Sequence, residues 1–134
     1  MINEQKTMNN KIKNNPAYNK AYALAIRIVK AFQYLSEEKR EFIISKQLLR
    51  SGTSIGANLA EAKGAISEAD LSAKVSIAYK EAQETKYWLH LLRDTGYIDD
   101  KAHDSIYADV DEVAAMLFAT LKTTRINKHK VDER

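Results

Sequence analysis

Apolar residues recur at steps of three and four along most of the chain, the spacing that places them on one face of an α-helix. Four such segments follow one another, separated by short polar stretches. The chain has one proline and four glycines, which leaves little material for the tight turns of a sheet protein. The pattern therefore predicts an all-α protein built from four helices.

The first helix is predicted to open near Pro16, because proline suits the first turn, and to end at Ser36. Its apolar stripe consists of Tyr18, Tyr22, Ala25, Val29 and Phe32, with Leu24, Ile28 and Leu35 beside it.

The second helix is predicted from about Glu37 to Lys63, with acidic residues at its amino end and Gly64 as its stop. Its apolar face consists of Phe42, Ile44, Leu48, Ile55 and Leu59.

The third helix is predicted to begin at Ser67, because a serine three residues before Asp70 resembles a capping box. Its seam steps by four and three through Leu71, Val75, Ala78, Ala82, Thr85, Leu89 and Leu92.

The stretch DTGYIDD separates the last two helices. Gly96 is expected to close the third helix, and Asp99 or Asp100 is expected to open the fourth. The fourth apolar stripe consists of Ile106, Val110, Val113, Leu117 and Leu121, widened by Ala114 and Phe118.

Short connections force neighbouring helices to run antiparallel. The sequence therefore predicts an up-down-up-down antiparallel four-helix bundle over residues 15–126. A flexible polar tail is expected at 1–14 and a flexible basic tail at 127–134.

The second helix holds two glycines in its interior, Gly52 and Gly56. Each costs roughly 1 kcal/mol relative to alanine, so we expect a neighbouring helix to pack closely against them. Beside them lies a polar row at helical spacing, made of Arg50, Ser54, Asn58 and Glu61.

The polar row has two readings. It could be a solvated or internally bonded helix face, or it could contact a partner or a second subunit. If it is buried, Arg50 needs a carboxylate, and Glu81 or Glu84 of the third helix is the expected partner.

The net charge of +3 comes from the chain ends. Residues 1–20 carry four lysines against one glutamate, and residues 122–134 carry five cations against two carboxylates, so the body between them is mildly acidic. Phosphate contacts are therefore expected at the ends, unless the charges serve only solubility. The candidate residues are Lys11, Lys13, Lys122, Arg125, Lys128 and Lys130.

Aromatic residues gather near the end of the third helix, beside Lys86 and Arg93. They could stack on bases of single-stranded nucleic acid, or they could belong to a protein interface or a bundle end. The cluster consists of Tyr87, Trp88, His90 and Tyr97.

Catalytic patterns are missing from the sequence. No histidine follows a glutamate at the spacing of a bundle di-metal site, and RSGTSIGAN lacks the lysine of a phosphate-binding loop. Cysteine is absent, and Ser54 has no evident activating histidine. We therefore predict no enzyme, no catalytic residue, no metal and no cofactor.

The composition also bears on location. No apolar run reaches the roughly 18 residues of a membrane span, and the first residues are polar. Together with the absence of cysteine, this predicts a cytoplasmic protein without membrane contact.

Two stretches resemble a known family. QLLRSGTSIGANLAEAKGAIS, residues 47–67, and SIAYKEAQETKYWLHLL, residues 76–92, are similar to bacterial four-helix bundle proteins encoded in intervening sequences of 23S rRNA genes. The motif positions are Gln47, Arg50, Ser54, Ile55, Asn58, Glu61, Ala78 and Glu84, and Glu81 stands where a serine is common.

The resemblance implies a left-handed bundle that assembles into a cyclic homopentamer. It also implies kinship with the accessory variability proteins of diversity-generating retroelements, which bind a reverse transcriptase and nucleic acid. Two functions follow as hypotheses: a non-enzymatic scaffold that binds RNA or an RNA-handling protein, or a self-assembling protein-interaction module without nucleic acid. The interface candidates are the motif residues together with Gly52, Gly56, Glu81 and Trp88.

Overall fold

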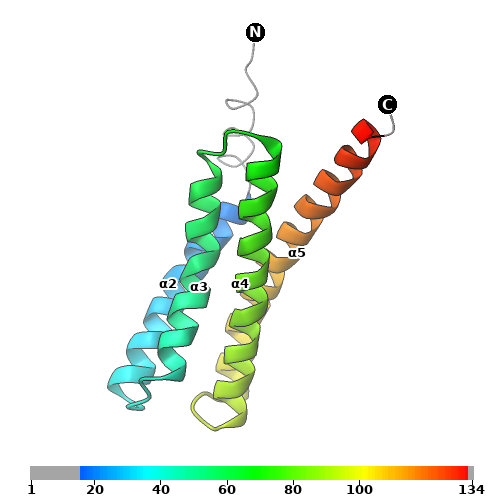
Figure 1. The fold of residues 1–134 in the computed structure, drawn as a ribbon. Coiled ribbons are helices and arrows are strands. Elements are labelled where there is room, and N and C mark those ends of the chain that lie inside the picture. The colour runs from blue at the N-terminus through cyan, green and yellow to red at the C-terminus, as the bar shows by residue number, and fades with distance from the viewer. Residues whose placement is uncertain (1–15, 133–134) are drawn as a thin grey trace.

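The computed structural model describes the backbone of residues 16–132 and the side chains of residues 16–124. Within this part of the chain there are four helices and no strand (Figure 1). The helices are α2 (Pro16–Glu37), α3 (Ile44–Ala62), α4 (Glu68–Asp94) and α5 (Asp100–Asp132). The all-α prediction is confirmed for the described residues.

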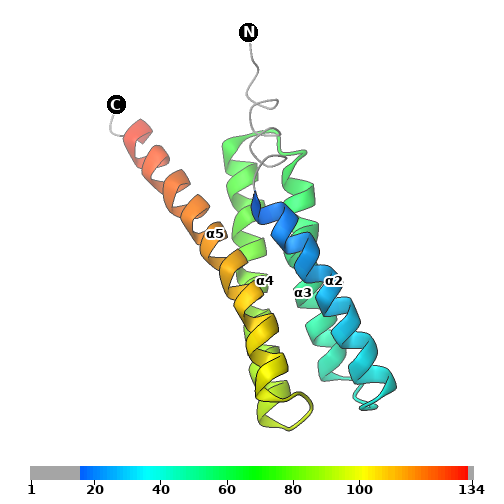
Figure 2. The same ribbon diagram turned by 180° about the vertical axis from the view of Figure 1, so that it is seen from behind.

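The four helices surround one core. Both α2 and α4 pack against α3 and against α5, so each helix has two neighbours. The α2–α3 loop and the α4–α5 turn lie at one end of the molecule, and the α3–α4 connection lies at the other (Figure 1). The C-terminal part of α5 diverges from the other helices (Figure 2).

The seam predicted for α4 is confirmed, because every one of its seven positions is buried. These residues face α3 on one side and α5 on the other, so little of the row meets solvent. In α5 the predicted stripe is also buried from Ile106 to Leu121, but Phe118 is exposed, and its ring lies tilted against that of Tyr79 with the centroids 5.9 Å apart.

The stripe predicted for α2 is wrong in its orientation. Tyr22 is 60% exposed and Val29 is 38% exposed, while the row beside them faces the core. Toward α3, Ile28 lies closest to Gly52 and Ala21 lies closest to Gly56. The buried residues of α2 are Ala17, Ala21, Leu24, Ile28 and Leu35.

The predicted start of the second helix is also wrong. Residues 38–43 form a loop, α3 begins at Ile44, and Phe42 is exposed. Arg40 has a φ of 54°, which interrupts a continuous helix. The buried carboxylate of Glu41 then accepts hydrogen bonds from the backbone N–H groups of Ile44 and Ser45, and so satisfies the free amino end of α3.

The helix ends predicted at Ser67, Gly96 and Asp99 are confirmed. Ser67 Oγ accepts a hydrogen bond from the backbone N–H of Asp70 at 3.0 Å. Gly96 has a φ of 83° after the last turn of α4, and Asp99 caps α5 by accepting a bond from the N–H of Ala102 at 2.7 Å. The helix α5 continues to Asp132, and the boundary between bundle and tail at residues 126 and 127 stays a prediction. No glycine or proline follows Gly96 to interrupt it.

Within the described residues, no helix is long and apolar enough to cross a membrane.

Candidate functional site

The two glycines of α3 meet α2 in different ways. A Cβ atom added to Gly52 would lie 2.8 Å from two carbons of the Ile28 side chain, which is closer than packed atoms allow. A Cβ atom at Gly56 would lie 3.7 Å from the backbone of Ala21, at ordinary contact distance. Close packing against α2 is therefore confirmed, and Gly52 is the position that requires it.

On the side facing α4, Arg50 pairs with both expected carboxylates. Its Nη1 lies 3.4 Å from Glu81 Oε2, and its Nη2 contacts Glu84 Oε2. Trp88 Nε1 donates to Glu84 Oε2 at 2.9 Å, and Arg50 Nε donates to Gln47 Oε1 at 3.3 Å. We call these five residues the Arg50 network.

The Arg50 network lies at the surface. The Arg50 side chain is 49% exposed, and that of Glu84 is 36% exposed. The pairing expected for Arg50 is therefore present although the row is not buried. Exposed ion pairs of this kind contribute at most about 1 kcal/mol each to stability. The main effect of the network is therefore to set the register of α3 against α4.

The rest of the polar row is bonded locally. Ser54 Oγ donates to the carbonyl of Arg50 at 2.6 Å, and Asn58 Nδ2 donates to the carbonyl of Ser54 at 2.8 Å. Glu61 pairs with Lys74 of α4 at 2.8 Å, and this hydrogen bond, helped by the carboxylate charge, raises the pKa of Lys74. The Ser54 and Asn58 bonds therefore lie within α3, whereas the Glu61–Lys74 pair joins α3 to α4.

A buried hydroxyl pair lies beneath the row. Thr85 Oγ1 donates to Ser51 Oγ at 3.0 Å, and both residues are fully buried. Thr85 was predicted on the seam, but sequence reasoning missed Ser51, because nothing in the helical spacing distinguishes a serine that finds a partner on the next helix. The motif residues Ile55 and Ala78 are also buried in the core.

The aromatic cluster predicted near the end of α4 does not form one platform. Tyr87 meets Trp88 edge to face at 4.8 Å, with Tyr87 exposed. His90 instead points toward α5, where it stacks on His103 with ring centroids 5.0 Å apart. Tyr97 packs against the core near the α4–α5 turn.

The two histidines form a pair that the sequence did not predict. His90 Nδ1 lies 2.9 Å from His103 Nε2, and His103 is buried. Burial, and then the nearby charges of His103 and Arg93, lower the pKa of His90. The described residues hold no group of three or more side chains arranged to bind a metal ion.

The outer face of α2 carries an apolar strip of Tyr22, Ile26 and Val29. These residues recur at helical steps of four and three, and all three are exposed, Ile26 by 45%. Tyr22 and Val29 belong to the stripe that the sequence pattern predicted for the core, whereas Ile26 does not. We call this surface the α2 strip.

The predicted phosphate contacts are only partly described. Lys122 is exposed on α5. The backbone positions of Arg125, Lys128 and Lys130 lie on the last turns of α5, beyond the described side chains. Lys11 and Lys13 lie outside the described residues.

Comparisons with known proteins agree on one family. The sequence profile of the 23S rRNA-intervening sequence protein matches residues 13–119. A crystal structure of a protein of unknown function from the S23 ribosomal protein family of Bacteroides thetaiotaomicron VPI-5482 is 47% identical, with a TM-score of 0.80. The similarity covers 82% of this chain and 98% of that one. A comparison with curated proteins gives no match.

Proposed function

The chain belongs to the 23S rRNA-intervening sequence protein family, and we propose that it is a non-enzymatic scaffold. In this proposal, left-handed up-and-down bundles assemble into a cyclic homopentamer in the cytoplasm. The basic ends of the assembled chains bind RNA or an RNA-handling protein.

The proposed assembly rests on the exposure of the α2 strip. Three large apolar side chains lie in a row on the face of α2 opposite to its core residues. Exposing apolar surface costs about 25 cal/mol per Å², and apolar patches of this kind mark sites of association. A second copy of the chain that covers the strip would remove this cost.

The geometry of α5 supports the RNA part of the proposal. Its C-terminal part diverges from the other helices, so the basic positions from Lys122 onward lie apart from the acidic body (Figure 2). Separation from the carboxylates of the body favours contact with a polyanion, because the attraction is set by local charge.

The polar row supports a role without catalysis. Its members bond to one another, to the α3 backbone or to α4. Such an arrangement joins two helices of a scaffold.

Fluorescence anisotropy with a labelled structured RNA tests the proposal on the full chain. We expect binding whose logarithm of affinity falls linearly with the logarithm of salt concentration. The double variant Lys128→Glu/Lys130→Glu should weaken binding at low salt about tenfold or more. The control Lys46→Glu/Lys80→Glu makes the same charge change at two exposed lysines of the body and should have a smaller effect. Absence of binding by the unchanged chain at low salt would contradict the RNA function.

One observation favours a second candidate function, a self-assembling module that captures a protein. Tyr87 is 58% exposed and lies against Trp88 on α4, and such aromatic pairs are common in protein interfaces. This candidate predicts assembly that is insensitive to salt, with no binding of RNA in the anisotropy series.

A further inference from the structure

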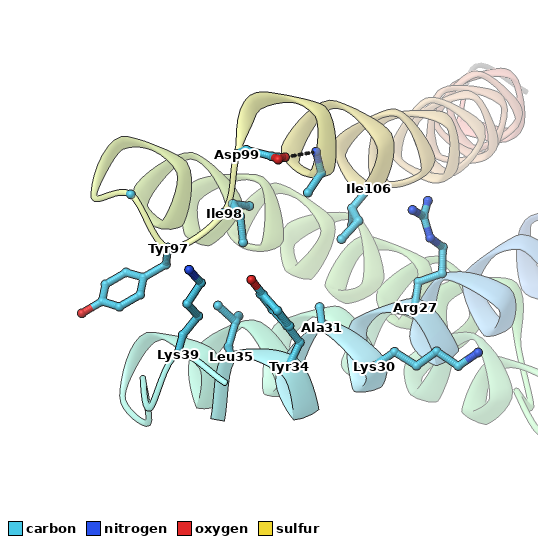
Figure 3. Close-up of a pocket in the computed structure, with 12 residues that line it drawn as sticks. Arg27, Lys30, Ala31, Tyr34, Leu35, Lys39, Tyr97, Ile98, Asp99 and Ile106 are labelled. Atoms are coloured by element: carbon cyan, nitrogen blue, oxygen red, sulfur yellow. Dashed lines mark hydrogen bonds between the residues drawn. The ribbon is translucent and has the colours of Figure 1, made fainter. Parts of the chain in front are cut away.

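A groove of about 670 Å³ lies between the C-terminal half of α2 and the turn that joins α4 to α5 (Figure 3). Its volume is in the range of small-molecule sites. The close-up shows Tyr34 and Lys39 extending from the α2 side toward Ile98, which comes from the turn. The apolar lining consists of Ala31, Leu35, Ile98, Ala102 and Ile106.

The lining carries more positive than negative charge. Three cations, Arg27, Lys30 and Lys39, border the groove together with one carboxylate, Asp99. Arg27 already pairs with Asp109 at 2.6 Å, and Asp99 caps α5. Neither Lys30 nor Lys39 has an ion-pair partner among the described residues, so both are free to meet an anion.

The groove also offers an aromatic surface. Tyr34 is 47% exposed, and its hydroxyl points into the gap near Lys39 (Figure 3). The Tyr34 hydroxyl makes no hydrogen bond to another described side chain or backbone group. A partly exposed ring beside an unpaired lysine is the combination that holds a base and its phosphate in single-strand binding sites.

We infer that this groove binds one nucleotide unit, with the base against Tyr34 and the apolar lining and the phosphate at Lys39. The inference rests on the proposed function, which supplies RNA as the ligand. A free mononucleotide offers the same chemistry, and the experiment distinguishes the two sources. An acidic peptide shares the negative charge but lacks the flat ring that matches Tyr34.

The test is methyl NMR of the full chain labelled at isoleucine, because methyl signals stay sharp in large assemblies. Ile98 and Ile106 line the groove, whereas Ile66 lies in the α3–α4 connection at the other end of the molecule. One titration uses uridine 5′-monophosphate and a second uses a short unstructured oligouridylate. We expect the Ile98 and Ile106 signals to shift saturably and the Ile66 signal to stay in place.

Two variants separate the contributions of charge and ring. Lys39→Glu should weaken binding about tenfold or more by reversing the charge at the phosphate. Tyr34→Leu keeps an apolar side chain but removes the stacking ring, and it should also weaken binding about tenfold. Lys46→Glu makes the same charge change outside the groove and should leave the affinity within about twofold of the unchanged chain.

The outcomes separate this inference from the proposed function. Shifts with both ligands, or with the oligonucleotide alone, support a nucleotide site used by RNA. Shifts with the mononucleotide alone support the site and, if anisotropy shows no RNA binding, contradict the RNA function. RNA binding by anisotropy without shifts at Ile98 would overturn the groove and leave the RNA function standing. Equal shifts with a hexaglutamate peptide would also overturn it, because charge alone would then explain the binding.

Discussion

The two sides of α3 pack against their neighbouring helices through different kinds of contact. Toward α2 the helix presents glycines to apolar side chains and backbone, and the space there is limited by Ile28 and Ala21. Toward α4 it presents Arg50 and Ser51, which bond to Glu84 and Thr85. The first contact depends on the absence of atoms, and the second depends on the presence of particular polar groups.

The difference explains why one helix can hold both two glycines and a polar row. The α2 contact is closest at Gly52, so adding a carbon there is costly. The outer part of the α4 contact is half exposed, so water can replace a lost bond at low cost. Substitutions should therefore have large effects on the α2 side and small ones on the exposed α4 side.

The largest effect is expected from Gly52→Leu. The new side chain would overlap Ile28, and overpacking of a core typically costs up to about 3 kcal/mol. Urea unfolding followed by circular dichroism measures the loss. The control Ala57→Leu adds the same side chain at an exposed position of α3 and should change stability by less than about 0.5 kcal/mol. A Gly52→Leu protein as stable as the unchanged chain would refute the close contact.

Alanine substitutions at the two glycines should have opposite signs. Gly52→Ala should destabilise by about 1 kcal/mol, because Ile28 must move away from the new Cβ atom. Gly56→Ala should stabilise by up to about 1 kcal/mol, because its Cβ atom has room and alanine favours the helix. Thermal melts of both variants measure the sign of each change in melting temperature. Changes of the same sign would mean that the two glycines are equivalent.

Removing the Arg50 charge should have a smaller effect. Arg50→Met keeps most of the side-chain length but loses the ion pairs with Glu81 and Glu84, and it should cost about 0.5 to 1 kcal/mol. The cost should shrink in about 1 M salt, because exposed charges are screened. A double-mutant cycle with Glu84→Gln measures the coupling directly. A loss of stability above about 2 kcal/mol that does not depend on salt would mean that the Arg50 ion pairs are buried from solvent.

The smallest effect concerns the α4–α5 contact and its dependence on pH. Folded His90 takes up a proton less readily than its ordinary pKa of 6.5 implies. The stability it contributes is therefore complete above that value and is lost as the pH falls through the lowered pKa. His90→Asn should flatten this part of the stability profile between pH 7 and pH 5, whereas Gly56→Ala should leave its shape unchanged. An identical slope in His90→Asn would assign the pH dependence to other groups.

Much of the fold could be predicted because α4 lies between two neighbours. Its regular seam, the Ser67 cap and the Asp99 cap are local patterns that tertiary contacts do not override. The pairing of Arg50 with Glu84 was predictable for a different reason, because consecutive antiparallel helices bring those positions together.

The face of α2 and the start of α3 could not be predicted from local pattern. Two apolar rows lie side by side on α2, and the spacing alone does not distinguish the exposed row of Tyr22 and Val29 from the buried one. The contacts with α3, where Ile28 meets Gly52, place the second row in the core. Glu41 resembles any charged surface residue until it folds back onto the amino end of α3. The groove joins residues far apart in the sequence, and no local signal indicates it.

The proposed assembly through the α2 strip is tested most directly by the mass of the full chain in solution. Sedimentation velocity at micromolar concentration should give a particle of five chains, each of 15.2 kDa. Ile26→Glu places a charge in the strip and should reduce the particle to single chains, while Ile43→Glu, in the exposed α2–α3 loop, should not. An unchanged protein that sediments as a single chain of 15.2 kDa would contradict the account.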